Sequence, residues 1–229
     1  MLPSQRHDDT QKQPCESSDD CNTFTDCITP NFTIAFVSDD RGMGVLASRA
    51  IHAGEEIIAE IPLISVCTEF GIAGILRSES VSTRAEQMLA EAVGDALEGL
   101  STEAQATFFA LSRAKSDYAG IATSHHLALG IFRTNALQTA AAIGSVFATC
   151  SRFNHSCQPN LSHRWDRKQG TLVLRAMRDI ACGTELTISY REEYLEGSGV
   201  PCTARRKQLW TDFGFWCACE RCAYEERNG

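Results

Sequence analysis

The stretch SRFNHSCQPN, residues 151–160, places Asn154, His155, Ser156 and Cys157 side by side and closes with a proline-bearing turn. An amide, an imidazole, a hydroxyl and a thiol all form hydrogen bonds, and the imidazole and the thiol can also bind a metal. Such a crowd of polar groups is hard to explain as ordinary core packing. The stretch is therefore the first candidate for a binding site.

A second group of thiols lies near the C-terminus, where FWCACERC places Cys217, Cys219 and Cys222 within six residues. The C-x-C-x-x-C spacing indicates metal ligation, and a closed structural zinc site needs four ligands. Cys157 is a candidate for the fourth ligand, but a free cysteine is also often a plain buried hydrophobic residue. Spacing alone leaves both interpretations of Cys157 open.

The composition favours a soluble protein with a real core. The chain has 229 residues, of which 43% are hydrophobic and 22% are charged, and its formal net charge is −8. We expect no membrane contact, because no apolar run is long enough to span a bilayer and the polar N-terminus lacks the apolar segment of a signal peptide. We therefore expect an intracellular protein, in the nucleus, the cytoplasm or both.

Charge and cysteine content narrow the classes of partner. Eleven cysteines in a reducing compartment favour metal ligation over disulfides. The acidic net charge argues against direct nucleic-acid binding, which relies on basic residues, and it permits a basic peptide as partner.

Three segments are expected along the chain: a mobile polar tail at 1–30, a mixed domain at 31–194 and a C-terminal segment at 195–229. The tail is rich in Ser, Asp, Gln and Thr and shows no periodicity, which is typical of disorder. It contains three cysteines that stand farther apart than typical zinc-ligand pairs, namely Cys15, Cys21 and Cys27.

The mixed domain alternates β-rich and helical patterns. Strands are expected within 33–37, 56–66, 161–165 and 171–176, bounded by turn residues. The pattern R-x-I-x-x-G-x-E-apolar occurs twice, at Arg49 and again at Arg178. We interpret each copy as a glycine turn that feeds a strand, so the fold should contain several small, similar β units.

The region from about 67 to 145 is expected to be a helical insert. Apolar side chains recur there at the helical period of 3.6 residues. Three helices are expected, one over 83–100, one from Thr102 to about Ser112 and one from His126 to Ile143. Two capping-box pairs mark the starts of the first two helices, Thr83 with Glu86 and Thr102 with Gln105.

The motifs RFNHSCQPN, ELTISY and C-x-C-x-x-C, in this order, resemble those of the SET-domain protein-lysine methyltransferases, and RGMGVLASRAIHAGEEI resembles the glycine-bearing N-terminal motif of that family. The resemblance covers roughly residues 32–223. It is closest to the SET-and-MYND (SMYD) subgroup, because ARRKQL and RTNA also look like that subgroup. The MYND finger and the C-terminal helical domain of the subgroup are not found, so its substrate preference is not expected to apply.

The resemblance implies an α+β fold of the SET, β-clip-like type. Several small β-sheets with a threaded pseudoknot would carry the helical insert and a zinc-bound post-SET segment at the C-terminus. The implied activity is transfer of a methyl group from S-adenosylmethionine to a lysine side chain of a protein, histone or non-histone. A catalytically weak or inactive SET-fold interaction module is the alternative, and a zinc-dependent nucleic-acid binder is a further one that the acidic charge opposes. We expect a monomer.

The resemblance also implies roles for particular residues. Tyr190, which ends ELTISY, is similar to the active-site tyrosine of the family. The implied S-adenosylmethionine contacts are Arg41, Gly42, Met43, Gly44, Asn135, Asn154, His155 and Phe215. The implied zinc ligands are Cys157, Cys217, Cys219 and Cys222.

Elementary chemistry is consistent with these roles. Methyl transfer from a sulfonium to an amine is an in-line displacement, in which alignment can lower the barrier by several kcal/mol. The lysine must be neutral, although a free lysine has a pKa of ~10.4. An apolar channel and a nearby positive charge both lower that pKa, so no paired-carboxylate base is needed.

Overall fold

The computed structural model describes residues 31–67, 83–113, 123–195 and 197–228. The predicted tail and its three cysteines lie outside these residues. The strands are β1 (Phe32–Ser38), β2 (Gly42–Ala47), β3 (Glu56–Glu60), β4 (Ile64–Cys67), β5 (Leu137–Ala140), β6 (Ile143–Val146), β7 (Asn154–His155), β8 (Leu161–Asp166), β9 (Thr171–Ala176) and β10 (Glu185–Ile188). The helices are α2 (Thr83–Glu98), α3 (Thr102–Phe109), α4 (Thr123–Asn135), α5 (Cys202–Phe213) and α6 (Glu220–Asn228), with short 3₁₀ turns at Cys150–Arg152 and Glu192–Tyr194.

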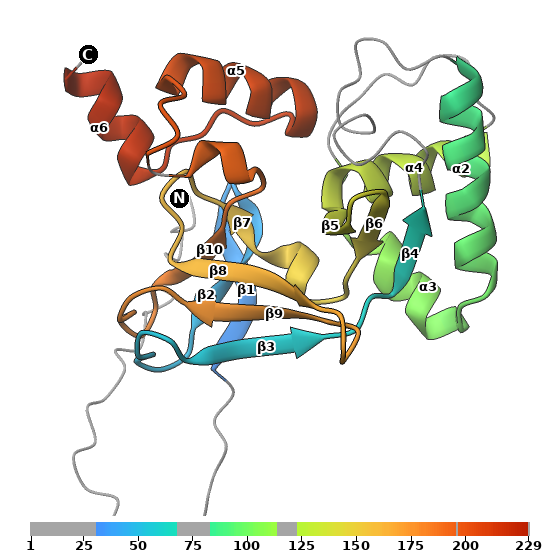
Figure 1. The fold of residues 1–229 in the computed structure, drawn as a ribbon, viewed down its shortest axis with the longest axis horizontal. Coiled ribbons are helices and arrows are strands. Elements are labelled where there is room, and N and C mark those ends of the chain that lie inside the picture. The colour runs from blue at the N-terminus through green and yellow to red at the C-terminus, as the bar shows by residue number, and fades with distance from the viewer. Residues whose placement is uncertain (1–30, 68–82, 114–122, 196, 229) are drawn as a thin grey trace, which may run out of the picture.

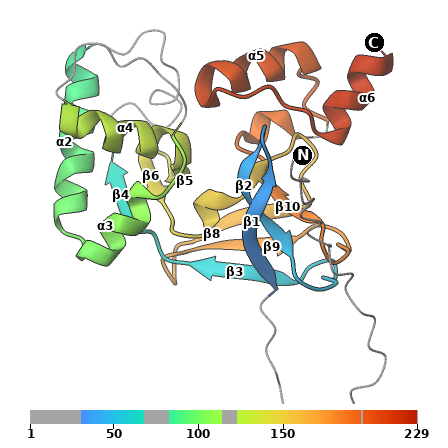
Figure 2. The ribbon, with the colours of Figure 1, turned by 180° about the vertical axis from the view of Figure 1, so that it is seen from behind.

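The strands form three small sheets with the orders β1-β2-β10-β7, β3-β9-β8 and β4-β6-β5. In Figures 1 and 2 the first two sheets lie together, while the third forms a lobe with α2, α3 and α4. Helices α5 and α6 lie beyond the end of the first sheet (Figure 1). The expected fold of several small sheets with a helical insert is confirmed. Within the described residues, no helix combines the length and apolar character needed to cross a membrane.

Strand β10 holds the first sheet together. It pairs antiparallel with β2, where Leu186 faces Val45, and parallel with β7, where Thr187 faces Asn154. Three segments that are far apart in the sequence therefore meet at one strand. This insertion of β10 is compatible with the expected pseudoknot, whose threading stays a prediction.

The two copies of the R-x-I-x-x-G-x-E pattern contact each other. Ile51 and Ile180 form an antiparallel bridge in which each amide donates to the carbonyl of the other, at 2.9 Å in both directions. Gly54 and Gly183 have φ of 84° and 79°, a left-handed conformation that only glycine adopts without strain. The repeat thus builds two matching turns beside one bridge.

The helical insert differs from its prediction in two places. The N-cap of α3 is Ser101, whose hydroxyl accepts from the Ala104 amide at 3.2 Å, so the predicted capping position, Thr102, is wrong by one residue. At the first predicted capping box, the carboxylate of Glu86 pairs with Arg133 at 3.1 Å. The side chain of Thr83, its predicted partner, is not among those that the structure describes.

The third predicted helix is wrong in its second half. Helix α4 ends at Asn135, and the chain continues as the hairpin β5-β6. Pairing with β4 decides this outcome, because β6 lies antiparallel between β4 and β5 and Val146 faces Ile64. The alanine-rich composition of 140–142 looks helical, but the neighbouring strands override that local preference.

Three hydrophobic cores support the fold. One lies in the helical insert and a second lies between the first two sheets. The third lies under α5 and α6, and its buried members are mostly cysteines, accompanied by Tyr194 and Leu209. Fully burying one large apolar side chain such as that of Leu209 contributes about 1.5–3 kcal/mol. Because this core buries few side chains of that kind, apolar packing alone gives it little stability.

Candidate active site and metal centre

Asn154 lies where β7 meets the turn that leads into β2. Its side-chain amide donates to the Met43 carbonyl at 3.2 Å and to the Glu185 carboxylate at 2.9 Å. A Cβ at position 44 would lie 2.7 Å from the Asn154 amide nitrogen and 2.6 Å from a methyl group of Val37. Gly44 is therefore required for this close approach.

Arg41 connects the same turn to β7 and β10. Its guanidinium pairs with the Glu185 carboxylate at 3.1 Å and donates to the His155 carbonyl at 3.2 Å. Gly42 allows the turn, with φ at 65°. The structure thus brings the predicted turn and the Asn-His pair together. The sequence analysis assigned no role to Glu185, whereas in the structure its carboxylate links Arg41 and Asn154.

The imidazole of His155 connects this region to a thiol. The Tyr190 amide donates to Nδ1 at 3.0 Å, so Nε2 carries the proton and lies 3.3 Å from Cys157 Sγ. Burial lowers the pKa of His155 to about 4, which keeps the ring neutral. The side chain of His155 is therefore occupied by contacts within the protein.

The Tyr190 hydroxyl donates to the Phe153 carbonyl at 3.0 Å. Its ring centroid lies 4.9 Å from that of Phe213 and 6.3 Å from that of Phe215. Burial raises the pKa of Tyr190 above its usual value, so the hydroxyl is neutral near pH 7. A neutral oxygen with a free lone pair can accept a hydrogen bond from an incoming amine.

A pocket of about 20 Å³ opens beside Tyr190, enough for roughly one water molecule. Its lining includes Asn135, Cys150, Phe153, Ile188, Tyr190 and Phe213. The Asn135 amide donates to the carbonyls of Ser112 and Ile131, at 2.6 and 2.7 Å. The structure therefore places Asn135 in the wall of this pocket, whereas the other predicted polar contacts gather at the β2 turn.

Four thiols converge between the turn after β7 and the helices α5 and α6. The Sγ atoms of Cys157, Cys217, Cys219 and Cys222 all lie within 4.8 Å of one another, and all four residues are buried. Cys157 Sγ lies 3.9 Å from Cys217 Sγ and 3.6 Å from Cys222 Sγ. Tetrahedral zinc with bonds of about 2.3 Å separates its sulfur ligands by about 3.8 Å.

The electrostatics divide the four thiols into two pairs. Hydrogen bonds from the neighbouring thiols, that of Cys157 foremost, lower the pKa of Cys219 and Cys222 and favour their thiolates, whereas the pKa values of Cys157 and Cys217 are raised in the metal-free cluster. The thiolate is the form that ligates zinc. The donor set that was predicted from sequence therefore has the number, proximity and chemistry that a structural zinc ion requires.

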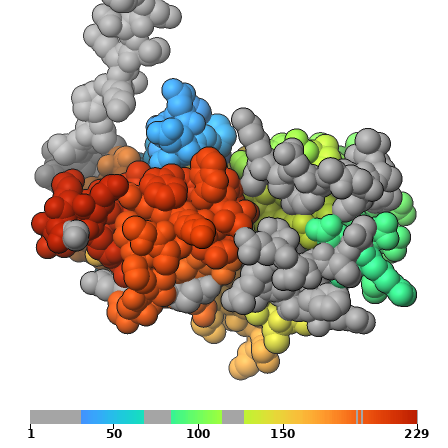
Figure 3. All heavy atoms as spheres, turned by 90° about the horizontal axis from the view of Figure 1, so that it is seen from above, coloured from blue at the N-terminus to red at the C-terminus, as the bar shows by residue number. Residues whose placement is uncertain are grey.

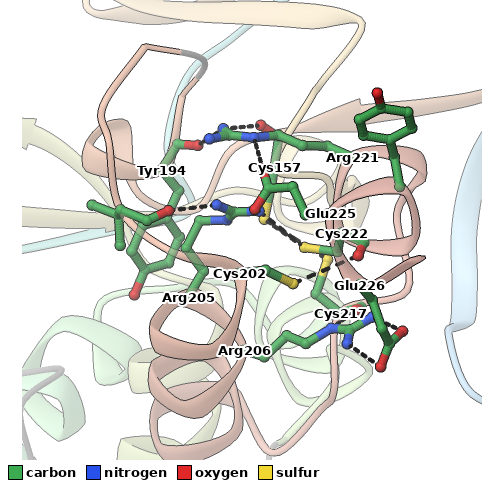
Figure 4. Close-up of polar contacts among 12 residues, drawn as sticks. Cys157, Tyr194, Cys202, Arg205, Arg206, Cys217, Arg221, Cys222, Glu225 and Glu226 are labelled. Atoms are coloured by element: carbon green, nitrogen blue, oxygen red, sulfur yellow. Dashed lines mark hydrogen bonds and ion pairs between the residues drawn. The ribbon is translucent and has the colours of Figure 1, made fainter. Parts of the chain in front are cut away.

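A fifth buried thiol lies beside these four. Cys202 donates to the Cys222 carbonyl at 3.6 Å and is not one of the converging ligands (Figure 4). All eight cysteines that the structure describes are free thiols.

The C-terminal segment carries its aromatic side chains to the tyrosine. Helix α5 ends at Phe213, its C-cap Gly214 adopts the left-handed conformation with φ at 74°, and the chain then turns toward Cys217. Arg191 and Asp212 form a buried ion pair that joins the end of β10 to α5. Phe215 was proposed from the sequence, whereas Phe213 was missed. The only feature of the sequence that pointed to Phe213 was its position two residues before Phe215. Figure 3 shows the segment as one continuous surface, with the β1 strand and the helical insert beside it.

Comparison with known protein families identifies the class of the protein. The family model described as the SET domain matches residues 42–191. This range begins at Gly42, the first residue of β2, and includes the Asn-His pair and Tyr190. The chain belongs to the SET-domain family.

Its relatives are named as methyltransferases. The histone-lysine N-methyltransferase set5 of Schizosaccharomyces pombe is 31% identical over 189 residues, covering 82% of this chain and 50% of that protein. The histone-lysine N-methyltransferase SMYD3 of Homo sapiens is 37% identical over 83 residues, covering 36% of this chain and 18% of that protein. The matched part of the chain thus spans half the length of the Schizosaccharomyces pombe protein and 18% of the length of the human protein.

Among solved structures, the SET domain of LSMT bound to lysine and AdoHcy aligns with 83% of this chain and 54% of that chain. Its TM-score is 0.44 and its sequence identity is 14%.

Proposed function

We propose that this protein is an S-adenosylmethionine-dependent protein-lysine N-methyltransferase. The observation that carries the proposal is the position of Tyr190 in a SET domain: it lines a pocket together with Phe213, its amide bonds to His155 of the Asn154-His155 pair, and its ring lies beside that of Phe215. The names of the yeast and human relatives support lysine as the acceptor.

The residues at the β2 turn suit the chemistry of the cofactor. S-adenosylmethionine supplies an activated methyl group on a sulfonium, and its other parts are an aromatic base, a ribose and an amino acid. Arg41 and Asn154 offer a cation and an amide close to the exposed residue Met43. Phe215, with its ring 6.0 Å from that of His155, offers an aromatic face for the base. We assign Gly42, Gly44 and Asn135 to the same site.

Tyr190 orients the substrate amine in this proposal. Because its hydroxyl donates to the Phe153 carbonyl, its oxygen is left to accept an N–H of the amine. The apolar side chains of Ile188 and Phe213 line the pocket and disfavour a charged amine there. The tyrosine thus aligns a neutral lysine and adds no charge of its own.

Zinc is the second cofactor that we propose, bound by the thiolates of Cys157, Cys217, Cys219 and Cys222. A structural zinc can supply ~10 kcal/mol or more of folding free energy. That is more than the few apolar side chains of the C-terminal core contribute. The ion would hold Phe213 and Phe215 against Tyr190.

The substrate in this proposal is a protein that presents a lysine in a basic segment, because the chain carries a formal net charge of −8. The free thiols of the described cysteines support residence in a reducing compartment, and we infer an intracellular protein that acts as a monomer. The division into a SET domain over 31–194 and a post-SET segment over 195–229 belongs to the same proposal.

Incubation with methyl-labelled S-adenosylmethionine and a mixture of candidate proteins tests the function. We expect label on lysine side chains, located by mass spectrometry of the labelled peptides. A chain that binds the cofactor and transfers no methyl group to any protein would instead be an inactive interaction module.

A further inference from the structure

Two adjacent arginines of α5 lie beside the cluster of thiols: Arg205 points into it, and Arg206 extends past Cys217 to Glu226 (Figure 4). The side chain of Arg205 is 0% exposed, and its Nη2 lies 3.4 Å from Cys222 Sγ. Arg206 is 7% exposed on its side chain, and its Nε donates to the Cys217 carbonyl at 2.7 Å. Both guanidinium groups therefore contact residues of the proposed zinc site, one at a sulfur and one at a backbone oxygen.

The carboxylates of α6 do not balance these charges. Arg205 pairs with Glu225 at 3.0 Å, and Arg206 pairs with Glu226 at 2.9 Å. Arg221 also pairs with Glu225, at 2.8 Å. In the part of the chain that the structure describes, three guanidinium groups thus share two carboxylates. Arg205 is fully buried and shares the Glu225 carboxylate with Arg221, so its charge is only partly compensated, and a further anion in this cluster would stabilise it.

A zinc ion with four thiolate ligands is such an anion. The ion carries two positive charges and the ligands four negative ones, so the centre as a whole carries a net charge of −2. Hydrogen bonds from charged donors to such an anion are stronger than neutral ones. Guanidinium groups have no free lone pair, so they cannot ligate the metal themselves and act only on its ligands.

We infer that Arg205 and Arg206 compensate the charge of the zinc centre and set its affinity for the metal. The inference rests on the proposed zinc site, which it deepens by naming the positioning residues that make a dianionic centre stable under α5. Arg205 contacts a ligand sulfur, and Arg206 fixes the carbonyl of the Cys217 ligand. Contacts of this kind change metal affinity by about 10- to 100-fold when they are removed.

A purely structural role predicts a different pattern of effects. If Arg205 only ties α5 to α6 through Glu225, removing either partner should weaken the fold and zinc binding to the same degree. If Arg205 compensates the thiolates, neutralising the Glu225 carboxylate leaves the guanidinium in place. Its positive charge then acts more fully on the Cys222 sulfur. Arg205→Met and Glu225→Gln therefore separate the two roles.

The measurement is the zinc dissociation constant, obtained by competition with a chromophoric chelator at one pH on the full chain. We expect Arg205→Met to weaken zinc binding about 10- to 100-fold, and Glu225→Gln to bind zinc as tightly as the wild type or more tightly. Arg205→Lys retains the charge and should recover most of the loss. Circular dichroism of the zinc-loaded proteins verifies folding.

Cobalt substitution gives a readout that a structural tie would not change. Loss of a cationic donor raises the energy of the sulfur lone pairs, so the sulfur-to-cobalt charge-transfer band should move to longer wavelength in Arg205→Met, whereas Arg205→Lys, which retains the charge, should stay close to the wild type. The band should stay at or below the wild-type wavelength in Glu225→Gln. Should Arg205→Met fail to fold, Arg206→Met with Glu226→Gln as its matched control repeats the affinity comparison.

The outcomes separate this inference from the proposed function. Equal zinc affinities in the wild type and Arg205→Met, or equal losses in Arg205→Met and Glu225→Gln, overturn charge compensation and leave the zinc site standing. A wild-type chain that binds no zinc overturns the zinc site and the inference together. Whether the wild type transfers methyl groups is tested by the labelling experiment and does not depend on these results.

Discussion

Tyr190 lies between the pocket and two aromatic rings of the C-terminal segment, with its hydroxyl bonded to the Phe153 carbonyl. Tyr190→Phe removes that oxygen and little volume, so alignment of the amine should suffer while the cofactor site stays intact. We predict at least a tenfold fall in methyl transfer, or about 1.4 kcal/mol in the barrier. Steady-state kinetics together with S-adenosylmethionine binding check this result. Wild-type turnover in the variant would remove Tyr190 from the mechanism.

Asn154 joins the β2 turn to β10 through its amide. Asn154→Ala should weaken S-adenosylmethionine binding by roughly 1–3 kcal/mol, the cost of leaving polar partners unsatisfied. Calorimetric titration measures the affinity, and thermal unfolding shows whether the variant is folded. Unaltered affinity in a folded variant would make the residue structural only.

The pH dependence of the reaction should follow the substrate lysine. The pKa of Tyr190 is raised by burial, so this hydroxyl stays protonated up to at least pH 10. Below the lysine pKa, the neutral fraction grows about tenfold per pH unit. We expect kcat/KM for a lysine peptide to rise between pH 7 and 9 with no descending limb. A fall of kcat/KM in that range would show that an essential group ionises there.

At the scale of the elements, Cys157 connects the turn after β7 to the loop between α5 and α6. Its sulfur contacts those of Cys217 and Cys222, and its neighbour His155 contacts Tyr190. Because the C-terminal core is formed mostly by thiols, the position of α5 and α6 should depend on the metal. The helices would then place the aromatic residues only when the ion is bound.

Cys157→Ser tests this connection. We predict loss of bound zinc, faster hydrogen exchange over residues 200–228, and unchanged exchange in β8 and β9, because those strands belong to a separate core. Cys202→Ser is the matched control, since Cys202 is buried in the same core and is not one of the four converging thiols. Metal content by atomic spectroscopy and hydrogen exchange provide the readouts. Full zinc content in Cys157→Ser would show that the fourth ligand lies elsewhere.

At the scale of the whole molecule, features that leave a local motif in the sequence could be predicted, whereas features that arise from long-range strand pairing could not. The glycine turns, the strands β1, β3, β8 and β9 and the thiols of the C-x-C-x-x-C motif were predicted because each leaves a short pattern in the sequence, whereas Cys157 was assigned as the fourth ligand only through the family resemblance. Glu185 and Phe213 were missed because their roles arise from the insertion of β10 and from the turn at Gly214. The hairpin after Asn135 was assigned to a helix because only its pairing with β4 makes it a strand.

We propose that the zinc centre and the cofactor site form one unit, joined through Cys157, His155 and the C-terminal aromatic residues. Calorimetric S-adenosylmethionine affinity, measured as zinc is removed with a chelator and then restored, tests this most directly. We predict that cofactor affinity falls in step with zinc content and returns with it, while circular dichroism shows the β-sheets intact throughout. Undiminished cofactor affinity in a folded, zinc-free chain would contradict the account.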